Sequence, residues 1–153
     1  MSRLLAIGSA ALDIKARLTR APLPTTDVPG QITLKPGGVA RNIAENLARL
    51  GVPVVFAGIM GDDPQARLLI ELSRAAGFDV QPFTRSAPAP DDLYRLKLPD
   101  VLPTATLNVV LGPDGRQIAG AFSGDILDAL QPGDLDQLQD LIDASPAILG
   151  DGG

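Results

Sequence analysis

The sequence predicts an α/β fold in which short buried strands alternate with helices that end at glycine. Residues 39–50 carry apolar side chains at helical spacing, and Gly51 and Pro53 end that helix. The apolar runs at 4–7 and 54–57 are typical of the inner strands of a parallel sheet. The chain has 153 residues, of which 45% are hydrophobic, which is enough for one domain with its own core. We therefore expect one α/β domain.

The first strand leads to an acidic side chain. The apolar run at 4–7 is short and is soon followed by Asp13 and Lys15, so we interpret it as a buried strand and not as a signal peptide. Ligands of α/β sheets gather beyond the carboxyl ends of the strands. Asp13 follows such an end and is a candidate ligand-binding residue; the alternative is an acid in a solvated loop. Residues 14–18 and 31–35 then alternate apolar and polar side chains, as half-exposed strands do.

A glycine turn and a polar side chain follow these strands. Gly37 and Gly38 lack Cβ atoms, so the backbone there can approach a ligand closely. Asn42 lies in the first turn of the next helix, where we expect free backbone N–H groups to point outward. Its amide both donates and accepts hydrogen bonds, which suits a polyhydroxylated ligand. The alternative is that Asn42 only satisfies local backbone groups.

The middle of the chain predicts a second helix and a second pair of strands. Asp63 is a good N-cap and Pro64 a good first residue for a helix that Gly77 ends. Because this cap accounts for Asp63, we expect no metal site at the neighbouring Asp62. A strand is expected at 78–83. Further on, Thr104 to Leu111 and Arg116 to Phe122 form a hairpin, whose Asn108 faces either a ligand or solvent.

Two other segments complete the prediction. Residues 84–104 contain a proline-rich tract that we interpret as an inserted loop or an extra edge strand, whose prolines and charges would limit edge pairing. Near the end, Asp134 is expected to cap a helix, and 146–149 reads as one more buried strand.

Composition excludes several classes of function. The chain has no cysteine and no histidine, which removes disulfides, zinc sites built on these residues, and triads with a histidine base. Its net charge of −5 argues against a nucleic-acid partner. No apolar run approaches the length of a membrane span, so a cytoplasmic location with no membrane partner is expected.

The pattern Gly37-Gly38-x-x-x-Asn42, followed by a helix, a glycine and the pair Gly61-Asp62, resembles the first signature of the pfkB (ribokinase-like) kinases. The run GGVARNIAENLARLG is similar to the pseudouridine-kinase branch. The resemblance implies a three-layer α/β/α sheet and a small β-sheet lid over a sugar or nucleoside, with lid strands at about 13–35 and 104–122. It implies these substrate-binding residues: Asp13, Gly37, Gly38, Asn42 and Asn108. Where the family has Asn-x-Asp after the first strand, this chain has Ala11-Leu12-Asp13.

The resemblance covers only the first half of the family pattern. The family's Asp-Thr-x-Gly-Ala-Gly-Asp motif, which holds its catalytic Asp, does not occur in residues 1–153. ATP and Mg²⁺ are implied by the family, but their site is not expected here, and no catalytic residue is assigned. We expect the substrate-binding and lid portion of a kinase, inactive on its own. The alternative is a non-catalytic sugar- or nucleoside-binding or dimerisation module. Self-association through the lid or an exposed sheet edge is expected in either case.

Overall fold

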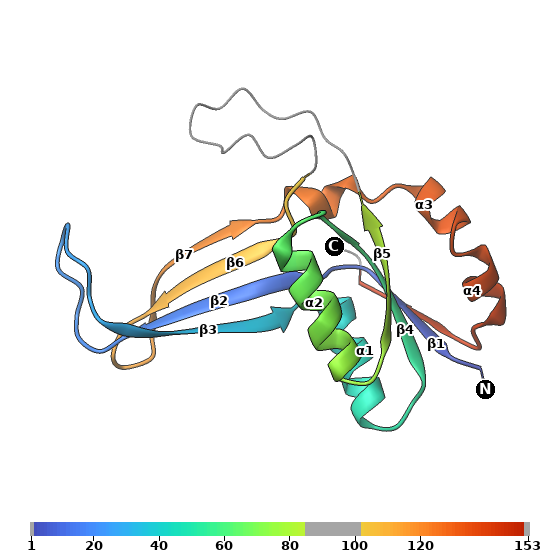
Figure 1. The fold of residues 1–153 in the computed structure, drawn as a ribbon, viewed down its shortest axis with the longest axis horizontal. Helices are drawn as coiled ribbons and strands as arrows, with labels where there is room; N and C mark the ends of the chain where they lie inside the picture. The colour runs from blue at the N-terminus through green and yellow to red at the C-terminus, as the bar shows by residue number, and fades with distance from the viewer. Residues whose placement is uncertain (1, 85–101, 152–153) are drawn as a thin grey trace.

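The computed structural model describes residues 2–84 and 102–151, which form a body and a projecting lid (Figure 1). The body is built on a parallel sheet with the strand order β5-β4-β1-β8. Its strands are β1 (Leu4–Ile7), β4 (Val54–Met60), β5 (Asp79–Thr84) and β8 (Ile148–Gly150). The apolar runs that predicted β1 and β4 are therefore neighbouring parallel strands.

Helices cover both faces of this sheet and make three layers. On one face lie α1 (Val39–Arg49) and α2 (Pro64–Ala75); on the other lie η1 (Asp125–Ala129), α3 (Pro132–Asp136) and α4 (Gln139–Ala144). Successive side chains of a strand point to opposite faces. Accordingly Ala6 packs with the α1 and α2 side, whereas its neighbour Leu5 packs with η1 and α4.

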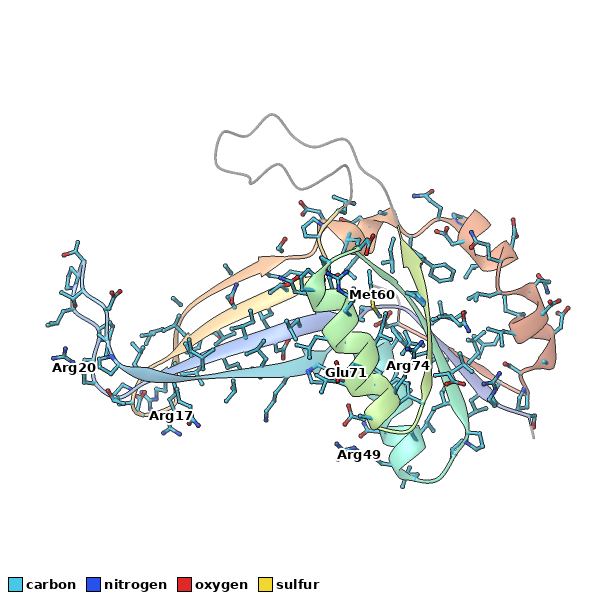
Figure 2. All side chains as sticks on the ribbon, in the orientation of Figure 1. Arg17, Arg20, Arg49, Met60, Glu71 and Arg74 are labelled. Atoms are coloured by element: carbon cyan, nitrogen blue, oxygen red, sulfur yellow. The ribbon has the colours of Figure 1, made fainter. Side chains whose placement is uncertain are left out.

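The lid is a second sheet with the order β3-β2-β6-β7. Its strands are β2 (Ala11–Leu18), β3 (Gly30–Gly37), β6 (Thr106–Leu111) and β7 (Gln117–Ser123). The two middle strands, β2 and β6, run parallel, and each outer strand is antiparallel to its neighbour. The lid extends away from the body, and Arg17 and Arg20 lie at its far end (Figure 2).

Two sequence predictions about helices need correction. In α1 the buried residues are Ala40, Arg41 and Ala44, whereas the ends of the predicted apolar stripe, Val39 and Leu50, are exposed. The small alanines allow close packing on the sheet, so Ala40 and Ala44 are the apolar residues buried on this face, beside Arg41.

Asp134 does not cap the helix that it was expected to cap. The helix α3 begins at Pro132, with Gln131 as its N-cap, and the Asp134 carboxylate accepts a hydrogen bond from the Gln131 backbone N–H at 2.8 Å. A proline at the first helical position needs no hydrogen-bond acceptor for its nitrogen, which favours this start. The predicted inserted loop at 84–104 falls largely outside the described residues. Among the described helices, none is long and apolar enough to cross a membrane.

Candidate functional site

Asp13 lies against the glycine turn. A Cβ atom added to Gly37 would be 2.7 Å from Asp13 Oδ1, so only glycine leaves room for this carboxylate. The antiparallel register that pairs Asp13 with Lys35 brings β2 and β3 to this point. A second cation, Lys15, has its Nζ 3.6 Å from Asp13 Oδ2. The acid and the first glycine of the motif, expected from separate parts of the sequence, are thus in contact.

Gly38 starts α1 in a conformation that other residues rarely adopt. Its φ is 96°, and an added Cβ would lie 2.4 Å from the Ser9 carbonyl oxygen. The Asn42 backbone N–H donates to the Gly38 carbonyl at 2.9 Å. Asn42 is therefore one helical turn from the residue that follows Gly37, and Asp13, both glycines and Asn42 lie around the same end of α1.

The backbone N–H groups at this helix start are not free, contrary to expectation. Val39 N–H donates to Ser9 Oγ at 3.0 Å, and Arg41 N–H donates to the Ser9 carbonyl at 3.3 Å. Ala40 N–H donates to Asp151 Oδ2 at 2.9 Å. These are the donors that a helix leaves without an intrahelical partner. A ligand here would be recognised through side chains, because the backbone amides are already used.

The Asn42 side chain is exposed and is held by a buried arginine. Arg41 Nη1 donates to Asn42 Oδ1 at 3.3 Å, and it pairs with Glu45 Oε2 at 2.6 Å. Arg41 Nε donates to Ser73 Oγ of α2 at 3.1 Å, and the guanidinium lies over the ring of Phe78. This network links α1, which carries Asn42, to α2. It also holds the Asn42 amide oxygen toward Arg41.

Glu45 is the acid of this network. Burial raises the pKa of Glu45, but the hydrogen bonds and charges of Arg41 and Arg49 outweigh burial, so the pKa lies below its usual 4.5. The two arginines differ in environment. The Arg41 side chain is 1% exposed, whereas the Arg49 side chain is 70% exposed at the end of α1 (Figure 2). Glu45 therefore mainly compensates the buried charge of Arg41.

Four side chains form a row across the lid that includes Asp13. Asp13 of β2 pairs with Lys35 of β3 on one side and with Leu107 of β6 on the other. Leu107 in turn pairs with Phe122 of β7. Residues that pair across strands lie on the same face of a sheet. Phe122 is 60% exposed, unusual for so large an apolar side chain. The face of the lid that carries Asp13 thus also presents an apolar and an aromatic surface.

Asn108 is the predicted site residue that the structure separates from the others. It pairs with Ile14 of β2 and is exposed. Because neighbouring residues in a strand point to opposite faces, Asn108 lies on the face of the lid away from Asp13. Alternation along the sequence could not decide this, since the choice depends on the register between β2 and β6.

The sequence did not reveal the parts played by Ser9, Arg41, Phe122 and Asp151. Ser9 followed the first strand, a position where ligands or caps are common, but its partner Asp151 is 142 residues away in the chain. Such a pairing follows from β1 lying beside β8, which no local pattern predicts. A helical wheel places Arg41 on the inner face of its helix. That position was the signal in the sequence from which its burial could have been predicted.

The site is not built for a metal or for nucleotide phosphates. Within residues 2–84 and 102–151, no group of three or more Asp or Glu side chains is arranged to hold a metal ion. Phosphates bind readily at helix N-termini. At α1 that position is taken by the Asp151 carboxylate. The residues around Asp13 and Asn42 therefore do not fit ATP and Mg²⁺.

Comparison with known proteins identifies the family. The pfkB family of carbohydrate kinases matches residues 1–98. The chain belongs to the pfkB family. Over 65 residues it is 40% identical to a pseudouridine kinase of Arabidopsis thaliana, covering 42% of this chain and 17% of that protein. Over 145 residues it is 28% identical to an uncharacterized sugar kinase, YeiI, of Escherichia coli K12, covering 95% of this chain and 36% of that protein.

Solved structures confirm the fold of this pfkB-family chain. A carbohydrate kinase from Agrobacterium tumefaciens superimposes with a TM-score of 0.80 at 26% identity. The match covers 98% of this chain and 45% of that one. The predicted ribokinase-like α/β/α body with a β-sheet lid is therefore confirmed. The chain spans less than half the length of these relatives.

Proposed function

We propose that this chain is the substrate-binding and lid portion of a kinase that transfers a phosphoryl group from ATP to a hydroxyl of a sugar or nucleoside. The observation that carries the proposal is the convergence of Asp13, the glycine turn and Asn42 around the start of α1. Pseudouridine is the first candidate substrate, given the 40% identity to a pseudouridine kinase over part of the chain. Such a kinase would work in the cytoplasm, with its ATP.

Each residue has a role that its chemistry supports. The Asp13 carboxylate accepts hydrogen bonds from ligand hydroxyls, and the Asn42 Nδ2 group donates one, since its oxygen already accepts from Arg41. Gly37 and Gly38 shape the binding site by letting the Asp13 carboxylate and the Ser9 backbone pack against the turn. Because the amides of α1 are bonded to Ser9 and Asp151, they are not free to bind an anion, which favours a neutral polyol as the ligand.

The lid face favours a ligand larger than a simple sugar. Neighbouring strands lie about 4.8 Å apart, so Phe122 is roughly 10 Å from Asp13 across two strands. A pentose bound at Asp13 does not reach that far, whereas the base of a nucleoside does. Phe122 and Leu107 offer that base an apolar surface on which to stack. This face supports a nucleoside substrate.

Phosphoryl transfer needs groups that neutralise charge on the moving phosphoryl group. The glycine-rich motif that supplies such groups in the family is absent from residues 1–153. We therefore expect these residues alone to release no ADP from ATP in a coupled assay with pseudouridine or ribose. Turnover by the purified chain would contradict this part of the proposal.

Substrate binding is tested by calorimetry with pseudouridine, uridine and ribose. Asp13→Ala and Asn42→Ala should each weaken binding by about tenfold or more, the effect of losing hydrogen bonds between a charged or polar group and the ligand. Asp114→Ala, in the exposed turn between β6 and β7, is the control and should bind as the unmodified chain does. Equal affinities in all four proteins would remove Asp13 and Asn42 from the site.

One observation favours the alternative of a dimerisation module. Ile32 and Leu34 are 66% and 49% exposed on β3, on the lid face opposite Asp13. Exposed apolar side chains of an outer strand promote self-association. Light scattering of the unmodified chain and of Ile32→Lys separates the readings: a dimer that Ile32→Lys abolishes, in a chain that binds no sugar or nucleoside, would favour the module.

A further inference from the structure

Asp151 is a half-buried carboxylate that lies beside the glycine turn, although it follows the far strand β8. Its two oxygens accept from the Ser9 backbone N–H at 3.0 and 3.2 Å, and Oδ2 also accepts from Ser9 Oγ and from Ala40 N–H. Its own backbone N–H donates to the Ile7 carbonyl at 3.3 Å. One side chain thus joins the end of β8, the end of β1 and the start of α1.

The carboxylate occupies the space that a side chain at position 8 would need. A Cβ added at Gly8 would be 1.8 Å from Asp151 Oδ1. Ser9 Oγ, which donates to Asp151, accepts in turn from Val39 N–H, so the hydroxyl relays the position of the carboxylate to the helix. The Ser9 carbonyl is also the atom that a side chain at Gly38 would strike. The placement of Ser9 therefore limits where the glycine turn can lie.

We propose that Asp151 is a positioning residue: its charge, acting with Ser9, holds the glycine turn and the first turn of α1 in the geometry that presents Asp13 and Asn42 to the ligand. The effect on ligand affinity rests on the proposed function. A carboxylate at a helix N-terminus also compensates the positive end of the helix dipole. Removing it would leave the Ser9 and Ala40 donors unsatisfied and would free the turn to move.

Two variants and one small molecule test the proposal. Asp151→Asn keeps the shape and removes the charge, and Asp151→Ala empties the space for an added formate ion. Asp140→Asn, at an exposed position on α4, is the control. The readouts are the amide NMR signals of Ser9, Val39 and Ala40 and the dissociation constant for pseudouridine, measured where circular dichroism shows every variant folded.

The expected results separate positioning from a general structural role. Both Asp151 variants should shift the three amide signals and weaken pseudouridine binding by about tenfold, as losing a hydrogen-bonded charge does. Formate should restore the signals and the affinity of Asp151→Ala and leave Asp151→Asn and Asp140→Asn unchanged. Unchanged affinity in folded Asp151→Ala would overturn the proposal, as would a failure of formate to restore its amide signals.

The same experiment distinguishes this proposal from the proposed function. If the unmodified chain binds no pseudouridine, uridine or ribose, the proposed function fails. The amide NMR signals alone then decide whether Asp151 positions the turn. If formate restores the signals of Asp151→Ala to those of the unmodified chain, the proposal is supported. If the signals do not respond to the Asp151 substitutions or to formate, the proposal is contradicted.

Discussion

The start of α1 and the lid sheet contribute differently to the same site. At α1, backbone N–H groups donate to Ser9 and Asp151, and the Arg41 side chain donates to Ser73, so backbone and side chains are held in place. The lid presents Leu107 and Phe122 on its Asp13 face, and all of β7 is exposed. The difference fits the function that we propose, in which a preorganised region binds hydroxyl groups and a more open surface selects the rest of the ligand.

The largest expected effect breaks the preorganised region. Arg41→Ala should lower the free energy of unfolding by about 3–5 kcal/mol, because it disrupts a buried ion pair and the bond to Ser73. Arg49→Ala is the matched control, since Arg49 pairs with the same Glu45 but is exposed. It should cost less than about 1 kcal/mol. Urea unfolding measures both, and equal losses would show that the burial of Arg41 does not matter.

A pair of glycines separates close approach from backbone strain. Gly38 and Gly77 both have φ of 96°, but only Gly38 has backbone atoms within 3 Å of an added Cβ. Gly77→Ala should cost about 1 kcal/mol of stability from its φ alone. Gly38→Ala should cost about 3 kcal/mol, because strain and collision with Ser9 add. Similar urea midpoints for the two variants would remove the packing argument at the turn.

Some of the features behind these predictions could be predicted from the sequence, and others could not. The helix stop at Gly51 and the N-cap Asp63 with Pro64 were predicted and are confirmed, because helix ends depend on local chemistry. The closeness of Asp13 to the glycine turn also follows from neighbouring elements. Asp151 and the side of the lid that carries Asn108 could not be predicted, since each depends on which distant strands pair.

The next prediction concerns the selectivity of the lid between ligands. The substitution should leave the free energy of unfolding nearly unchanged. Phe122→Ala should weaken pseudouridine binding by about tenfold, the range expected for losing a base stacked on an aromatic ring, and ribose binding by less than about twofold. Ile32→Ala is the control, because the Ile32 side chain is exposed to a similar extent as that of Phe122 but lies on the opposite lid face. Calorimetry measures the four values. A loss of the same size for ribose would contradict stacking as the role of Phe122.

The smallest effect is a pH dependence. Because the folded-state pKa of Glu45 is lowered below 4.5, its stabilisation is present above that pH and is lost as the pH falls through the folded-state pKa. Glu45→Gln should flatten the acid limb of the curve of unfolding free energy against pH, by less than about 1 kcal/mol between pH 7 and 3. Glu71→Gln, at an exposed position on α2 (Figure 2), should keep it. Identical acid limbs for the unmodified chain and Glu45→Gln would refute this contribution.

The most direct measurement is an NMR titration of the ¹⁵N-labelled chain with pseudouridine, following every backbone amide. If one ligand is held by the region around α1 and by the lid face, the amides of Asp13, Gly37, Gly38 and Asn42 shift together with a single dissociation constant, and those of Phe122 follow them, while Ile32 stays unchanged. If Asp13 and Asn42 respond with different constants, or neither responds, the shared site does not exist.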